Sequence, residues 1–159
     1  MKHRKSILLI PAMALSLAAC SNSGASSVPS SQAGAPSVNG PAVPEGVAVT
    51  VDQWSVVSST STYAAGPVTF TATNGGTIDH ELVVLRTKTA AADIPVASFE
   101  GEQGRINEDT AGTNVGETGD LISGSTKTFS VDLKPGHYVL FCNLPGHYES
   151  GMHIDVTVV

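Results

Sequence analysis

The chain has 159 residues, with 8 Lys and Arg against 14 Asp and Glu, which gives a formal charge of −6. Residues 1–19 hold three of the basic residues and no acidic one, so the remainder has five basic against fourteen acidic residues, a charge of −9. This balance argues against a nucleic-acid-binding protein and against electrostatic adsorption to anionic lipid. It favours protein partners with basic patches.

The first 19 residues have the order of regions that is typical of a secretory signal. Basic residues precede an apolar run from Ile7 to Leu17, and small residues follow it; the run is too short for a membrane-spanning helix. The segment Leu17-Ala-Ala-Cys20 resembles the cleavage box of bacterial lipoproteins. The resemblance implies cleavage before Cys20 and lipidation of Cys20. The alternative is an ordinary secretory signal followed by an incidental cysteine.

Residues 20–45 follow as a segment of almost only Ser, Ala, Gly, Pro and Val, without an aromatic residue. Such a segment buries too little apolar surface to offset its conformational entropy, so we expect a disordered tether behind the lipidated cysteine. The remaining residues, 46–159, are enough for one small domain that buries its own core.

Short runs of alternating, β-branched or aromatic residues dominate this domain. Ile154, Val156 and Val158 alternate with polar residues, as a half-buried strand requires. Gly, Pro and Asn residues mark turns between the runs. The expected strands are 47–51, 68–72, 128–133, 137–142 and 153–158. They predict an all-β domain, either a two-sheet sandwich or a flattened barrel.

Residues 86–120 do not fit this pattern. They are acidic, rich in Gly and Thr and poorly periodic. We expect a long excursion between strands with one short helical turn, which is either a docking or lid segment or a solvated insertion without function.

The loop near the C-terminus carries the clearest chemical signal. Cys142, His147 and Met152 are separated by four residues each way, so a thiolate, an imidazole and a thioether can converge from one loop. This donor set suggests copper, and two His, one Cys and a distant Met are the ligands of a blue-copper centre. The second imidazole is expected from His80, at the start of an apolar strand 62 residues before Cys142. If Cys20 carries lipid, Cys142 is a lone exported thiol, and it needs either protection or a ligand role, because structural cysteines are normally paired in an oxidising compartment.

These motifs together resemble those of the cupredoxins, the small blue copper proteins. The resemblance rests on Asn74-Gly75, His80-Glu-Leu-Val-Val, Pro135-Gly-His-Tyr-Val-Leu-Phe-Cys142, Pro145-Gly-His147 and Gly151-Met152. It implies a Greek-key sandwich of about eight strands with one copper, Cu(II) or Cu(I), at one end. His80, Cys142 and His147 would be the trigonal ligands and Met152 the axial one. The ring edge of His147 would be the electron port, with Leu144 and Pro145 in an apolar patch.

Five residues near these motifs have other expected roles. His137 is five residues before Cys142 and therefore faces the opposite side of a strand, so we read it as a surface residue. His153 is either a plain surface residue or a residue at the copper end that donates a hydrogen bond to a copper ligand or forms a weak secondary metal site. Glu81 follows His80 where several cupredoxins have Asn or Ser, so it either locks the copper loop less well or faces solvent. Phe141 and Leu144 are expected to exclude water from the Cys142 sulfur.

The sequence therefore predicts a membrane-tethered, type 1 copper protein that carries single electrons between redox partners with basic patches. We expect a monomer that is not an enzyme, because one metal site without an open position suits electron transfer better than catalysis. The expected location is an exported compartment, with the lipid anchor on a bacterial membrane facing the periplasm or the extracellular side. The alternative function is copper binding for homeostasis or for delivery to metalloenzymes.

Overall fold

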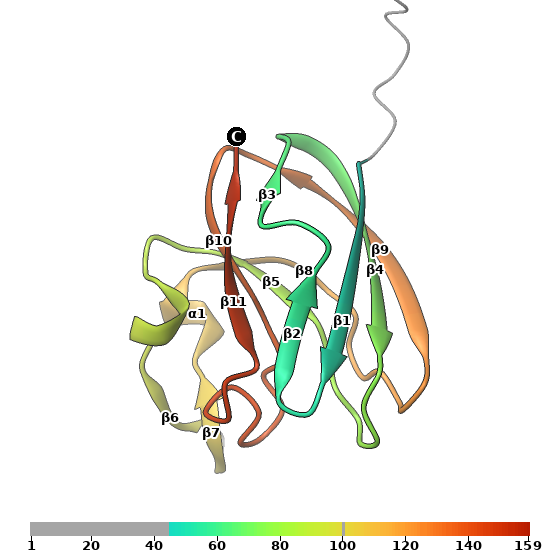
Figure 1. Ribbon diagram of the computed structural model, residues 1–159. Coiled ribbons are helices and arrows are strands. Elements are labelled where there is room, and N and C mark those ends of the chain that lie inside the picture. The colour runs from blue at the N-terminus through green and yellow to red at the C-terminus, as the bar shows by residue number, and fades with distance from the viewer. Residues whose placement is uncertain (1–44, 100) are drawn as a thin grey trace, which may run out of the picture. The chain divides into compact units, whose positions relative to one another are not determined.

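Two β-sheets pack face to face in the computed structural model, which describes residues 45–99 and 101–159 (Figure 1). The first sheet has the order β2-β1-β4-β9 and the second the order β3-β11-β10-β5-β8, while β6 and β7 form a separate hairpin. The strands are β1 (Glu45–Asp52), β2 (Ser55–Ser58), β3 (Thr62–Tyr63), β4 (Gly66–Asn74), β5 (Val83–Arg86), β6 (Val96–Phe99), β7 (Glu102–Ile106), β8 (Thr113–Glu117), β9 (Thr126–Leu133), β10 (Gly136–Phe141) and β11 (His153–Val158). Two short helices, η1 (Ala91–Asp93) and α1 (Glu108–Ala111), complete the described elements.

The expected all-β Greek-key sandwich is confirmed, with eleven strands in the described residues rather than about eight. The pairs β1–β4 and β3–β11 are parallel and the other pairs are antiparallel. Strand β4 shows how sequence alternation becomes a layer. Its residues Val68, Phe70 and Ala72 are buried between the sheets, and the intervening threonines face outward.

Strands β5 and β10 are instead buried on both faces. Val84 and Leu140 point into the core between the sheets. Val83, Leu85, Val139 and Phe141 point the other way, into a second apolar cluster completed by residues of η1, β7 and the loop before β11. This explains why these strands are almost continuously apolar rather than alternating.

The segment between β5 and β9 is more regular than the sequence pattern indicated. It contains η1, the β6–β7 hairpin, α1 and β8, and β8 joins the second sheet beside β5. Its buried residues Ala91, Ile94 and Ile106 cover the outer face of β5 and β10. The excursion is therefore a second layer on this sheet. Its apolar residues are too few and too irregularly spaced to reveal this in the sequence.

Strand β1 begins at Glu45, next to the expected start of the domain. The signal segment, Cys20 with its expected lipid and the tether lie outside the described residues, apart from Glu45 itself. Within residues 45–99 and 101–159, no helix has both the length and the apolar character needed to cross a membrane.

Candidate metal centre

Three buried side chains from two segments distant in the sequence meet beyond the C-terminal ends of β4 and β10. His80 lies in the loop after β4, where its backbone pairs with Leu121 through N–H···O bonds of 3.0 and 2.7 Å. Cys142 follows β10 directly, and His147 lies in the loop that leads to β11, which we call the copper loop (residues 142–152). His80 and Cys142 are 0% exposed and His147 is 8% exposed, so the site is shielded from solvent.

The donor atoms are close enough to share one metal ion. His80 Nδ1 lies 3.1 Å from His147 Nδ1, and Cys142 Sγ lies 3.2 Å from His147 Nδ1 and 3.9 Å from His80 Nδ1. Metal bonds of about 2.0–2.3 Å to nitrogen and sulfur place three donors in a trigonal plane about 3.5 Å apart. The observed distances bracket this value. Thiolate and imidazole donors suit copper, so the cluster fits a single type 1 copper site.

Met152 closes the copper loop beside this cluster. Cys142 N donates to Met152 O at 3.0 Å, and Met152 N donates to His147 O at 3.2 Å. Its side chain is fully buried in the same core cluster as Cys142. Backbone hydrogen bonds thus link Met152 to the two candidate ligands of the same loop, Cys142 and His147.

Burial sets the protonation of the donors in the metal-free site. Desolvation lowers the pKa of His80, against the raising effect of Asp52 and Asp79, and lowers the pKa of His147. Both imidazoles are therefore neutral near pH 7 and have a lone pair to offer. Desolvation also raises the pKa of Cys142 to about 11, so the sulfur is a thiol until a metal displaces its proton.

Glu81 supports the loop rather than facing solvent. Its backbone N–H points to Cys142 Sγ at 3.4 Å, and its carboxylate accepts a bond of 2.9 Å from Asn143 N. Burial, with smaller contributions from Glu108 and Glu117, raises the pKa of Glu81 to about 7, against the lowering effect of its bond to Asn143. This residue links the His80 segment to the first residue after Cys142, the role that the sequence left open.

Asn74 organises the turn before His80. Its fully buried side chain donates to Ile78 O at 2.8 Å and Leu121 O at 2.7 Å, and accepts from Gly76 N at 2.8 Å. A Cβ at Gly76 would lie 3.0 Å from His80 Nε2, so glycine lets the turn approach the imidazole closely. Asn74 of the Asn74-Gly75 motif therefore holds the turn before His80 in place.

Trp54 was missed by the sequence reasoning. It lies in the turn between β1 and β2, and its indole meets the His147 ring edge-on, with the ring centroids 5.2 Å apart at 80°. It is 49% exposed, so it both covers His147 and reaches the surface. His147, whose ring edge was expected to be exposed, is therefore covered in part by Trp54 and is only 8% exposed. Only its status as the single tryptophan marked it in the sequence.

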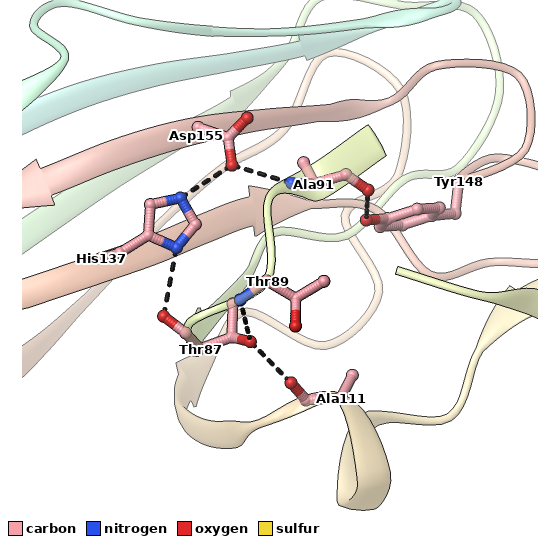
Figure 2. Close-up of polar contacts among 7 residues, drawn as sticks. All are labelled: Thr87, Thr89, Ala91, Ala111, His137, Tyr148 and Asp155. Carbon is pink, nitrogen blue, oxygen red and sulfur yellow. Dashed lines mark hydrogen bonds and ion pairs between the residues drawn. The ribbon is translucent and has the colours of Figure 1, made fainter. Parts of the chain in front are cut away.

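The other expected roles have mixed outcomes. His137 faces away from Cys142, as predicted, but it is half-buried rather than a free surface residue, because it bonds to Thr87 O and Asp155 (Figure 2). His153 is half-buried and stacks on Tyr148 with a centroid distance of 4.6 Å, outside the donor cluster. The expectation for Phe141 was wrong, because it points into the second apolar cluster, away from the sulfur. Leu144 does pack against the core that holds Cys142.

Comparison with known proteins agrees with this geometry. A family model for the sulfocyanin (SoxE) domain matches residues 59–159, which include all four expected ligands. No curated protein matches the chain.

Solved structures with the same fold include two auracyanins and an azurin. An auracyanin from Roseiflexus castenholzii is 22% identical with a TM-score of 0.52, over 76% of this chain and 99% of its own. An azurin from Methylomonas sp. strain J is 18% identical with a TM-score of 0.51, over 74% of this chain and 99% of its own. Auracyanin A from Chloroflexus aurantiacus, a "blue" copper protein, is 16% identical with a TM-score of 0.52, over 74% and 100%. At these identities the likeness establishes the fold.

Proposed function

The chain belongs to the sulfocyanin family of cupredoxins, and on that premise we propose that it is a blue-copper protein that carries single electrons between redox partners. The convergence of His80 Nδ1, Cys142 Sγ and His147 Nδ1 in one buried cluster carries the proposal. Met152 is proposed as the weak axial ligand, because the backbone ties it to Cys142 and His147.

The donor set accounts for the redox role. Bound copper supplies reversible one-electron exchange between Cu(II) and Cu(I), and a His₂Cys set with a distant thioether suits both states. The protein's part is to hold the donors in place and to exclude water. Burial of Cys142 and the N–H of Glu81 pointing at its sulfur both tune the thiolate. Cupredoxins are generally electron carriers rather than enzymes, and the proposal assigns no catalytic residue.

Partner contact is proposed at the copper end. Trp54 is exposed, and its ring contacts His147. Pro145, which lies in the copper loop two residues before His147, is also exposed. With a charge of −9 outside the first 19 residues, the protein is expected to attract redox partners that carry basic patches. A monomer suffices for this role.

We propose export and lipid anchoring through Cys20. Support comes from the basic, apolar and small-residue order of residues 1–19 and from Leu17-Ala-Ala-Cys20. A Cys20→Ser variant produced in a bacterial host is expected to leave the membrane fraction, and mass spectrometry of the mature N-terminus should find acyl groups only on the unaltered protein. An unacylated N-terminus in the unaltered protein would refute the anchor.

Copper delivery is the rival function, and the burial of all three donors favours electron transfer over release. The test is to reduce the copper-loaded protein and mix it with a Cu(I) chelator. We expect slow copper loss together with a reversible one-electron wave in voltammetry. Rapid loss to the chelator without a reversible wave would favour delivery.

A further inference from the structure

The excursion contacts the copper loop through strand β7. Gly146 N donates to Gln103 O at 2.9 Å, and Glu149 N donates to Gly104 O at 3.4 Å. Gly104 has φ +73°, and a Cβ there would lie 2.6 Å from Gly146 Cα, so only glycine allows this approach. The two bonds flank His147, and β7 therefore lies against the backbone on both sides of this donor.

Asn143 makes a second and stronger connection. Its side chain is buried, accepts from Ile106 N at 2.9 Å, and donates to Ile106 O at 3.1 Å and to Glu108 Oε1 at 2.9 Å. The amide thus pairs with the Ile106 peptide group as a neighbouring strand would. Because Asn143 directly follows Cys142, these bonds fix the copper loop at its beginning.

Tyr148 anchors the other side of His147 to the excursion. Its buried hydroxyl donates to Ala91 O at 2.7 Å, and Ala91 N donates to Asp155 Oδ1 at 2.8 Å. The same Asp155 oxygen bonds to His137, so the η1 segment is tied to β10 and β11 as well as to the copper loop (Figure 2). The anchor point at Ala91 is therefore itself held by the second sheet.

We propose that the excursion is a positioning device for His147, with Asn143 and Gly104 as its positioning residues. A ligand on a loop is placed accurately only when neighbouring elements fix the loop's backbone. Here the backbone before and after His147, at Gly146 and Glu149, bonds to strand β7 of the excursion rather than to solvent. The loop is consequently held in its metal-binding form without metal. The inference rests on the proposed copper site, but its first test needs no copper.

That test follows amide hydrogen exchange in the metal-free full chain. In Asn143→Ala, the Gly146 and Glu149 amides, whose acceptors lie on β7, are expected to exchange at least about tenfold faster, as loss of a net hydrogen bond of this kind allows. Gly104→Ala should have the same effect through the Gly146 contact. Glu108→Gln keeps an acceptor for Asn143 and should leave the rates near those of the unaltered protein.

Asn74→Ala is the matched control, because Asn74 is also buried, also makes three side-chain bonds and lies outside the excursion. Referred to each variant's global stability, it should leave the Gly146 and Glu149 amides unchanged. Unchanged rates in both Asn143→Ala and Gly104→Ala, or an equal rise in Asn74→Ala, would overturn the proposal.

Copper then supplies a second readout. In copper-loaded Asn143→Ala, the thiolate-to-copper absorption band should shift or split. In copper-loaded Glu108→Gln, the spectrum should match that of the unaltered protein. An unchanged band and potential in Asn143→Ala would overturn the positioning role. Absence of any such band in the unaltered protein would instead refute the copper site, and the exchange result would still stand on its own.

Discussion

Replacing Asn74 by alanine removes three hydrogen bonds from the turn that precedes His80. The buried Gly76 N–H loses its partner, which costs about 1–3 kcal/mol for an unsatisfied donor. The carbonyls of Leu121 and Ile78 also lose their bond from Asn74, but Leu121 O keeps its bond from His80 N, and Ile78 is exposed, so that water can replace Asn74. Together these two losses add about 1 kcal/mol to the cost. The expected loss is therefore about 3 kcal/mol in the free energy of unfolding.

Urea denaturation of the metal-free protein measures this loss. Asn114→Ala is the control, because Asn114 also makes three side-chain bonds, to Glu108, Glu117 and Gly116, but is exposed. It should lose less than about 1 kcal/mol, since water replaces its partners. Equal losses in the two variants would show that burial of the Asn74 bonds does not brace the His80 turn.

Three further results are expected. In metal-free protein, burial raises the pKa of Glu81 from 4.5 to about 7 in the folded state, so the contribution of Glu81 to the free energy of unfolding should fall between pH 4.5 and about 7 and level off above. His80 and His147, whose pKa burial lowers, contribute in the opposite direction in both proteins, so the Glu81 contribution is the difference between the pH profiles of the unaltered protein and Glu81→Gln. Glu81→Gln should remove on the order of 2 kcal/mol of that fall, allowing for partial exposure, and an identical pH profile in urea titrations would contradict the assignment. Trp54 is the single tryptophan, so one equivalent of Cu(II) should quench most of the protein's fluorescence through the contact with His147; emission that survives saturation would argue against that contact. Tyr148→Phe should lose about 1 kcal/mol of stability in urea, because Ala91 O loses its buried donor, and no loss would mean that the bond contributes nothing.

The copper loop was readable from the sequence because its information is local. Cys142, His147 and Met152 lie within eleven residues, so their spacing can be recognised without knowing how the rest of the chain folds. Strand alternation in β11 is equally local, and the all-β sandwich, the cupredoxin relationship and copper as the cofactor are confirmed. The structure brings His80 into the cluster from a distant segment. The ligand roles themselves remain predictions.

The parts that could not be read depend on contacts between distant segments. Residues 102–108 contact the copper loop through backbone groups and through the Glu108 side chain, which accepts a hydrogen bond from Asn143 of the loop. Such contacts leave no periodic pattern in the sequence. Trp54 reaches His147 only because the β1–β2 turn lies at the copper end. Phe141 was assigned to the wrong side because β10 is apolar on both faces, so its pattern does not reveal which residues face the metal.

The most direct test of the copper centre is the visible absorption spectrum of the purified protein after one equivalent of Cu(II), followed by ascorbate and reoxidation. An intense blue band that bleaches on reduction and returns on oxidation is expected, and it should be absent from Cys142→Ser. A pale complex without that band in the unaltered protein would contradict a thiolate–copper redox centre formed by His80, Cys142 and His147.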